Sequence, residues 1–259
     1  MIFDTHMHCN YSCDSHMEFD DAVAAAESQN IGIVFTEHWD YDYPTNPDAF
    51  IFDIDEYFSV TGKLRSEKIL TGIEIGMQVH TAAADDKVAA GHPFDFVLGS
   101  IHCVQRQDIY ERAFYQGRSK AEVVKAFLTD AITCVENHQN FDSFAHIDYI
   151  CRYWPYTDKE LRLEEEQELF DRLFLALIER NKPMEINTRR LDDAQACEAL
   201  LAIYQRYKQL GGNYCTIGSD AHYSEHVGRR LDTALMLAQK AGLQPVYFKE
   251  RKMYLMGEV

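Results

Sequence analysis

Short apolar segments rich in Ile, Val and Phe alternate with longer stretches of helical spacing along the whole chain, and this alternation restricts the fold strongly. The predicted strands are Ile2–His8, Ile31–His38, Ile69–Ile75, Phe94–His102, Phe141–Ile147, Met184–Thr188 and Tyr214–Ser219. The predicted helices are Phe19–Gln29, Ile54–Glu67, Lys120–Asn137, Glu160–Arg180, Asp192–Leu210 and Ser224–Ala241. Such alternation implies an α/β fold with parallel strands, and seven units favour a barrel over an open sheet, although the pattern alone does not separate the two.

The length of 259 residues is normal for one α/β barrel of roughly 250 residues. No Gly/Ser-rich linker, repeat or low-complexity tract divides the chain, so we predict a single domain over residues 1–259. The tail Val246–Leu255 alternates apolar and polar residues and is predicted to form an extra strand or hairpin that closes one end.

The net charge of the chain indicates which partners it can bind. The chain has 25 basic and 42 acidic residues and a formal net charge of −17, so it repels a nucleic-acid backbone. We therefore predict no nucleic-acid partner, and an anionic substrate must be captured by local metal ions or arginines.

The first residues, Met1 to Cys9, resemble neither a basic leader nor an apolar signal core, and no window approaches an 18-residue apolar span. We predict a cytoplasmic protein without a membrane segment. The 7 cysteines lack CxxC spacing, which favours reduced and mostly buried thiols over a disulfide framework.

Histidines and carboxylates follow or end the predicted strands, and parallel strand ends converge on one face of a barrel. The candidates are His6, His8, His38, Glu74, His102, His146, Asp220 and His222, with His16 in a loop at the same end. Imidazoles and carboxylates without thiolates suit zinc, manganese or iron. The two-residue spacing places His6 and His8 on the same side of a strand, although a lone His-x-His is a weak signal.

Glu74 lies between Ile73 and Ile75 in a strand that we expect to be covered on both faces. A buried carboxylate needs a cationic partner, because leaving it unpaired costs several kcal/mol. An arginine is one candidate partner. The other is a metal ion, and the two carboxylate oxygens allow Glu74 to bridge two metals.

These residues resemble the motifs of the PHP (polymerase and histidinol phosphatase) superfamily from residue 4 to residue 222. The motifs are His6-Met7-His8, Glu37-His38, the lone Glu74, Gly99-Ser100-Ile101-His102, Ala145-His146-Ile147-Asp148 and Gly218-Ser219-Asp220-Ala221-His222. The resemblance implies a distorted seven-stranded (β/α) barrel, similar to a TIM barrel, with the active site at the C-terminal ends of the strands. It also implies two to three divalent transition metals.

The ligand sets that the resemblance implies are His6, His8, Glu74 and Asp220 for one metal, Glu74, His102 and His146 for a second, and His16, His38 and His222 for a third. It also implies that Glu74, Asp220 and His222 are catalytic residues.

The segment Glu185-Ile186-Asn187-Thr188 and the length resemble the histidinol-phosphatase branch, in which arginines bind the substrate phosphate. Arg152 and either Arg189 or Arg190 occupy suitable positions at strand ends. A surface salt bridge is the alternative role for each arginine, because the 42 acidic residues offer many partners.

The expected activity is hydrolysis of a small phosphate monoester, with L-histidinol phosphate of histidine biosynthesis as the first candidate. Metal-bound water attacks phosphorus in such enzymes. The aromatic and acidic residues of the loop Trp39–Asp53 are expected to receive the imidazole and the amine of this substrate. A phosphodiesterase or exonuclease and a non-catalytic metal-binding domain are the alternatives, and the oligomeric state stays open.

Overall fold

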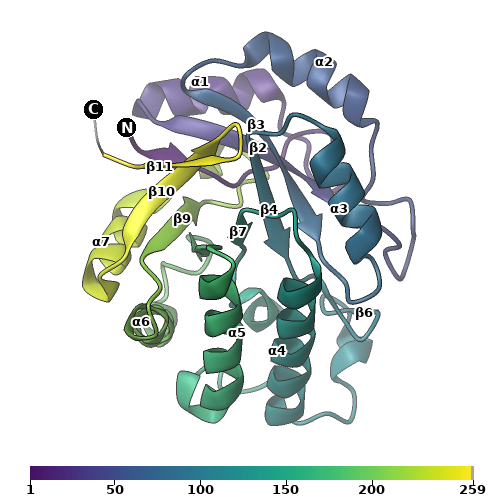
Figure 1. Ribbon diagram of the computed structural model, residues 1–259, viewed down its shortest axis with the longest axis vertical. Coiled ribbons are helices and arrows are strands. Elements are labelled where there is room, and N and C mark those ends of the chain that lie inside the picture. The colour runs from purple at the N-terminus through teal and green to yellow at the C-terminus, as the bar shows by residue number, and fades with distance from the viewer. Residues whose placement is uncertain (258–259) are drawn as a thin grey trace.

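The protein is built around a curled sheet of nine strands, and the computed structural model describes residues 1–257 (Figure 1). The strands pair in the order in which they occur in the chain, and only the last two are antiparallel. Their bounds are β1 (Phe3–Asp4), β2 (Gly32–Trp39), β3 (Ile69–Gly76), β4 (Phe96–Ser100), β7 (Ser143–Phe144), β8 (Met184–Asn187), β9 (Tyr214–Gly218), β10 (Gln244–Lys249) and β11 (Lys252–Leu255). A small separate hairpin of β5 (Cys103–Val104) and β6 (Gln107–Asp108) follows β4.

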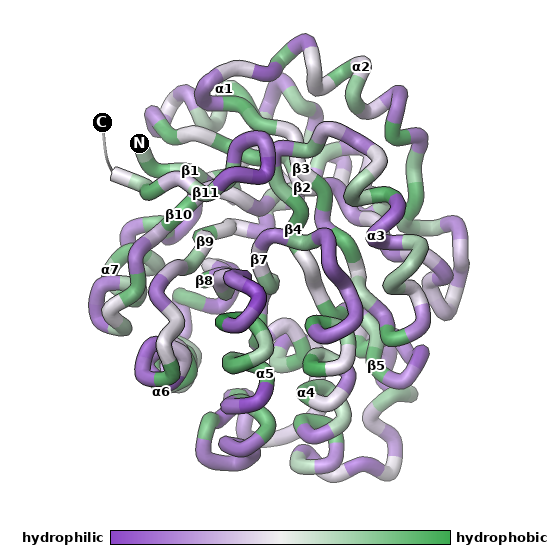
Figure 2. Tube along the Cα trace, viewed as in Figure 1, coloured by the Kyte–Doolittle hydropathy of each residue, from purple (hydrophilic) through white to green (hydrophobic). Residues whose placement is uncertain are grey.

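Helices connect the parallel strands and cover the outside of the sheet (Figure 1). They are α1 (Phe19–Gln29), α2 (Ile54–Leu64), α3 (Ala82–Gly91), α4 (Lys120–Asn137), α5 (Gln167–Glu179), α6 (Ala194–Gln209) and α7 (Leu231–Ala241). Hydrophobic and hydrophilic residues alternate along these helices, as Figure 2 shows, because one side packs on the sheet. The alternation of strand and helix that the sequence predicts is confirmed.

The helix α3 was not predicted. Its residues AAADDKVAAG include one large apolar side chain, Val88, so no helical pattern of apolar residues identifies it. Four predicted helices are shorter in the structure: the second ends at Leu64, the fourth begins at Gln167, the fifth spans Ala194–Gln209 and the last begins at Leu231.

The sheet closes into a distorted barrel at the C-terminal ends of its strands. The backbone after β1 pairs with the backbone after β9, where Met7 and Ala221 form a parallel bridge. The amide of Thr5 donates to the carbonyl of Ile217 (2.9 Å), and that of His8 donates to Ala221 (2.8 Å). Seven parallel strands, β1 to β9 without the small hairpin, therefore form the predicted (β/α) barrel.

The opposite end of the barrel is filled by the C-terminal hairpin β10–β11. Val246 and Phe248 of β10 belong to the same buried cluster as Phe3, Val34 and Leu70 from the beginnings of the first strands. The ring of Tyr247 stacks on Phe3 with centroids 4.0 Å apart. The predicted hairpin at the end of the chain is thus confirmed, and its apolar face fills the barrel interior.

Within residues 1–257, none of the helices combines the length and the apolar character that a membrane-spanning segment needs.

Candidate metal centre and substrate cavity

The side chains that face the barrel interior are apolar near the start of each of the strands β2 and β3 and polar near its end. Side chains two residues apart on a strand share a face, so the face that carries Val34 in β2 also carries Thr36 and then His38. In β3 the same spacing leads from Leu70 to Glu74. In these two strands the fold therefore places His38 and Glu74 in the barrel interior at the C-terminal ends.

Glu74 lies at the centre of this polar layer and is completely buried. One of its oxygens, Oε1, lies 2.9 Å from Nε2 of His146, 3.4 Å from that of His6 and 3.5 Å from that of His102. The other oxygen, Oε2, lies 2.8 Å from Nδ1 of His38 and 3.5 Å from Nε2 of His8. A single carboxylate thus faces imidazole nitrogens from several strands, which is the arrangement expected of a bridging metal ligand.

His6 and His8 direct their Nε2 atoms toward each other at 3.0 Å, on the side of Glu74 that faces Asp220. Asp220 Oδ1 lies 3.6 Å from Nε2 of His8 and 3.9 Å from that of His6. The backbone of Asp220 has φ = 53°, a left-handed conformation that costs a non-glycine residue of order 1–3 kcal/mol. The hydrogen bond from the Asp220 amide to the His6 carbonyl (2.8 Å) helps to hold it.

A third group of donors consists of His8, His38 and His222, whose ligand atoms lie within 4.8 Å of one another. Asp14 approaches this group from the loop after β1, with Oδ2 3.2 Å from Nε2 of His222 and 3.6 Å from Nε2 of His38. His16 was predicted to occupy this place, but its side chain is exposed and joins none of the donor groups among the described residues.

The turn geometry of the loop explains this difference. Two successive backbone hydrogen bonds, Ser12 to Cys9 (3.1 Å) and Ser15 to Ser12 (3.0 Å), fold the loop. The hydroxyl of Ser15 then donates to the carbonyl of His8 at 2.8 Å. These contacts direct Asp14 toward His222, and His16 lies beyond the turn. Every other predicted ligand is part of the donor groups.

The charges in the centre are strongly coupled. Burial opposes a charge on Glu74, but the imidazoles of His6, His102 and His38 hold the pKa of its carboxyl well below the usual range. Burial likewise opposes a charge on His6, but the carboxylates of Glu185 and Glu74 raise its pKa well above the ordinary value. The carboxylates therefore require positive charge in this small buried volume.

Metal ions fit this donor set. Within residues 1–257, three buried atoms of one donor group have no partner in hydrogen-bonding geometry, although two of them are 2.8 Å apart: Nδ1 of His38, Oε2 of Glu74 and Nε2 of His102. Buried polar atoms are normally satisfied, so unsatisfied nitrogen and oxygen atoms this close together fit a bound cation. Imidazole nitrogens and carboxylate oxygens are ligands that zinc, manganese and iron accept.

Two further buried carboxylates orient the candidate ligands, and their roles were not foreseen from the sequence. Glu185 Oε1 lies 2.7 Å from Nδ1 of His6, and Asp40 Oδ1 lies 2.8 Å from Nδ1 of His102. In each case a glycine makes room: a Cβ on Gly218 would lie 2.3 Å from Glu185 Oε1, and one on Gly76 would lie 1.7 Å from Asp40 Oδ1. Carboxylates behind ligand imidazoles fix the ring orientation and the tautomer.

Glu37 plays a similar part for the loop that carries Asp14. Its carboxylate accepts hydrogen bonds from the amides of Cys9 (2.7 Å) and Ser12 (2.8 Å) and from the Ser12 hydroxyl (2.7 Å). Burial raises the pKa of Glu37 to about 7 although these hydrogen bonds lower it. The Ser12 hydroxyl also lies 3.2 Å from Nδ1 of His8, so Glu37 and Ser12 connect the loop to the donor set.

The structure separates the three candidate arginines. Arg152 donates to Asp220 Oδ2 (2.7 Å) and to Asn187 Oδ1 (3.2 Å), and Arg189 lies 3.8 Å from Asp220 Oδ1. Arg190 instead pairs with the buried carboxylates of Asp148 (3.2 Å) and Glu160 (2.8 Å). The expectation that Arg190 binds substrate is thus not supported, because both of its charge partners belong to the packed interior of the loop region.

A cavity of about 160 Å³ opens directly onto the centre. Its walls carry Asp14, His38, His102, His146, Tyr149, Tyr153, Arg189, Asp220, His222 and Tyr223. We expected the aromatic rings of the site to come from the loop after β2. The tyrosines in the cavity wall are instead Tyr149, Tyr153 and Tyr223. In that loop Asp40 supports His102, Tyr41 is exposed, and Asp42 pairs with His80 (2.9 Å) and Arg106 (2.8 Å).

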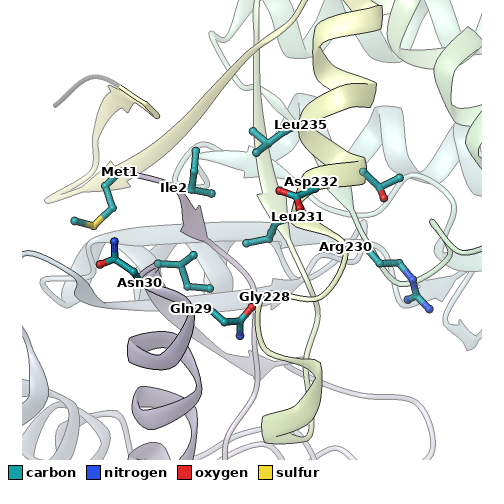
Figure 3. Close-up of a pocket in the computed structure, with 11 residues that line it drawn as sticks. Met1, Ile2, Gln29, Asn30, Gly228, Arg230, Leu231, Asp232 and Leu235 are labelled. Carbon is teal, nitrogen blue, oxygen red and sulfur yellow. The ribbon is translucent and has the colours of Figure 1, made fainter.

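A larger cavity of about 830 Å³ lies elsewhere, between the start of β1, the end of α1 and the start of α7 (Figure 3). Its ionisable side chains are Arg230 and Asp232, and the rest of the wall includes Ile2, Ile31 and Leu235. Among the described residues, its wall includes no histidine and none of the candidate metal ligands. The smaller cavity is the candidate site because its walls carry the chemistry.

Several known proteins are similar to this chain over most of its length. The family model described as PHP domain matches residues 4–189. A probable histidinol-phosphatase of Clostridium acetobutylicum is 42% identical over 98% of this chain and 99% of its own length. A histidinol-phosphatase of Lactococcus lactis is 32% identical over 92% of this chain and 91% of its own length.

Among solved structures, the histidinol phosphate phosphatase of Lactococcus lactis, in complex with zinc, L-histidinol and phosphate, matches with a TM-score of 0.90 and 30% identity. The match covers 98% of both chains. The fold class predicted from the sequence is thereby confirmed. Together with the family model and the relatives, this shows that the chain belongs to the PHP domain family and, within it, to the histidinol-phosphatases.

Proposed function

We propose that this protein hydrolyses L-histidinol phosphate to L-histidinol and inorganic phosphate. The observation that carries the proposal is the position of Glu74, whose two oxygens face five imidazole nitrogens within 3.5 Å, beside Arg152 and Arg189. A relative bound to zinc, L-histidinol and phosphate has the same fold over 98% of the chain, which supports this choice of substrate.

The proposed cofactors are two to three divalent transition metals, with zinc first because the Lactococcus structure contains it. His6, His8, Glu74 and Asp220 would hold one metal, and Glu74, His102 and His146 a second, as their mutual distances allow. His38 and His222 would hold a third together with Asp14 in place of His16. Bound metals of this kind supply an activated water molecule and neutralise charge on the phosphoryl oxygens.

The chain's own residues would orient the substrate. Arg189 lies in the cavity wall and Arg152 directly behind Asp220, so both guanidinium groups are near the place where the phosphoryl group must lie. Arginine binds phosphoryl oxygens through charge-assisted hydrogen bonds. Glu74, Asp220 and His222 would serve catalysis by holding the metals in register with that phosphoryl group, and Tyr149 and Tyr153 offer ring faces for the imidazole end.

We also propose that residues 1–259 act as one domain in a reducing, cytoplasmic compartment, without a nucleic-acid or membrane partner. The support is that the described elements pack on one sheet, that Cys9, Cys103, Cys134, Cys151 and Cys215 are buried free thiols, and that the net charge of −17 opposes binding of nucleic acid.

The experiment that tests the substrate is a steady-state phosphate-release assay on the zinc-loaded protein. We expect kcat/KM for L-histidinol phosphate to exceed that for glycerol phosphate and p-nitrophenyl phosphate by roughly tenfold or more, because a matched pocket discriminates by differential transition-state binding. Equal values would refute the substrate. A faster reaction with a nucleotide diester would instead favour the phosphodiesterase alternative.

A further inference from the structure

Asn187, the last residue of β8, contacts both arginines of the candidate site. Its Oδ1 accepts hydrogen bonds from Nη2 of Arg152 (3.2 Å) and from the backbone amide of Arg189 (3.0 Å). Its Nδ2 donates to Oε2 of Glu185 at 3.2 Å. Only 2% of Asn187 is exposed, so water does not replace these contacts.

The contact with Glu185 connects Asn187 to the metal centre. Glu185 is completely buried, and its other oxygen lies 2.7 Å from Nδ1 of His6. The Oε2 atom that receives Asn187 also accepts from the backbone amide of His146 at 2.8 Å. One continuous set of hydrogen bonds therefore runs from two candidate metal ligands through Glu185 and Asn187 to the arginines.

An amide is well suited to this position. The carbonyl oxygen receives two donors while the NH₂ group donates to a carboxylate, and no other side chain of this size offers both functions. A carboxylate at residue 187 would be repelled by the carboxylate of Glu185. An apolar residue would leave the donors of both arginines without their acceptor.

Arg152 shows why the second contact matters. Its Nη1 is paired with Asp220 Oδ2 at 2.7 Å, and its guanidinium lies 4.8 Å from the Tyr149 ring centroid. Without the acceptor on Asn187, the guanidinium would be held by one ion pair and could pivot around it. The hydrogen bond to Asn187 fixes the plane of the guanidinium. A guanidinium with fixed N–H directions recognises phosphoryl oxygens specifically.

We infer that Asn187 is a positioning residue that sets the geometry of Arg152 and Arg189 relative to the metal centre and thereby determines the affinity for the phosphoryl group. The inference rests on the proposed function, because it assigns a phosphoryl group to these arginines. It does not depend on the identity of the alcohol.

The test measures binding of inorganic phosphate to the zinc-loaded protein by calorimetry, for the wild type and for Asn187→Leu. We expect the Kd of phosphate and the KM of the monoester to rise roughly tenfold while zinc content and the circular dichroism spectrum stay unchanged, since one charge-assisted contact is weakened. Asn187→Ser, whose hydroxyl is too short to reach the guanidinium of Arg152, should give the same result and covers the case in which the leucine variant fails to fold.

The matched control is Thr188→Val at the neighbouring residue. Thr188 is completely buried and its hydroxyl has no hydrogen-bond partner in the part of the chain that the structure describes, so this nearly isosteric change should leave the Kd of phosphate unchanged. An equal loss in Thr188→Val and Asn187→Leu would show a general packing effect and overturn the inference.

A double-mutant cycle with Arg152→Ala identifies the route. If Asn187 acts through Arg152, Asn187→Leu should weaken phosphate binding less in the Arg152→Ala background than in the wild type. Fully additive losses with both Arg152→Ala and Arg189→Ala, or an unchanged Kd in Asn187→Leu, would overturn the inference. A protein that binds phosphate in this Asn187-dependent way but does not hydrolyse L-histidinol phosphate would refute the proposed substrate alone.

Discussion

At the scale of single residues, the site depends on which of two neighbouring side chains faces inward. Asp14 and not His16 lies beside His222, and Arg189 and not Arg190 lies in the cavity wall. The first choice follows from the turns that Ser12 and Ser15 hold, and the second from the ion pairs of Arg190 with Asp148 and Glu160. They lead to two predictions in which one member of each pair is the natural control for the other.

Asp14→Asn should lower the zinc content by about one ion per chain at limiting zinc, because the amide keeps the volume but loses the charge that faces His222 and His38. His16→Ala should leave the zinc content unchanged, because His16 is exposed. Elemental analysis after equilibration with buffered zinc measures both. A loss of zinc in His16→Ala alone would restore the ligand set that the family resemblance implies.

Arg189→Ala should lower kcat/KM for the monoester. The loss should correspond to about 1.5–3 kcal/mol of activation free energy, the contribution of a charge-assisted hydrogen bond, without loss of folding stability. Arg190→Ala should lower the free energy of unfolding by about 2–4 kcal/mol, because it leaves Asp148 and Glu160 buried without their partner. Steady-state kinetics and urea denaturation separate the two effects. The reverse pattern would assign the substrate to Arg190.

At the scale of elements, glycines at the strand ends leave room for the carboxylates that orient the ligand histidines. Gly76 at the end of β3 leaves the space through which Asp40 reaches His102, and Gly218 at the end of β9 does the same for Glu185 and His6. The strands thus position the imidazoles and the carboxylates behind them together.

Gly76→Ala should weaken zinc binding at the site of His102 by roughly 10- to 100-fold, the usual effect of losing a supporting carboxylate. The reason is that the new Cβ would lie 1.7 Å from Asp40 Oδ1 and displace it. The control is Gly62→Ala within α2, where an added Cβ meets nothing within 4 Å and should stabilise the helix by about 0.4–1 kcal/mol. Zinc titration and thermal unfolding measure the two outcomes, and unchanged zinc affinity in Gly76→Ala would contradict the supporting role of Asp40.

At the scale of the whole molecule, the barrel interior has an apolar end that stabilises the fold and a polar end that carries the candidate metal ligands. Phe248 and its neighbours fill the end of the barrel where the strands begin, and the charged donor set fills the end where they finish. The second half of this interior contains Glu74, Asp220 and Glu185 with little exposure to water. Such a concentration of carboxylates is stable only with compensating positive charge.

Chelation should therefore destabilise the whole protein. A site at a hundredfold excess of zinc over its Kd contributes about 2.7 kcal/mol to the free energy of unfolding, and removal of the metal loses that contribution. We expect the thermal unfolding midpoint to fall after treatment with EDTA and to recover when zinc is restored. An unchanged midpoint would mean that protonated imidazoles alone balance these carboxylates.

The sequence alone determined the features that follow from local periodicity. The two-residue repeat of a strand places His38 and Glu74 inward beyond Val34 and Leu70, and parallel pairing brings such strand ends together, so the barrel and most of its donor set were predictable. Periodicity fails where its signal is absent, as in α3, where alanines show no apolar side.

Only the tertiary structure decided which side chains of the irregular segments join the site. The turns held by Ser12 and Ser15 aim Asp14 at the donor set, and the carboxylates of Asp148 and Glu160 draw Arg190 away from it. Glu185 and Asp40 reach their histidines only because glycines leave space on neighbouring strands. A side chain in a loop is oriented by long-range hydrogen bonds, ion pairs and free volume, and no repeat in the sequence encodes these.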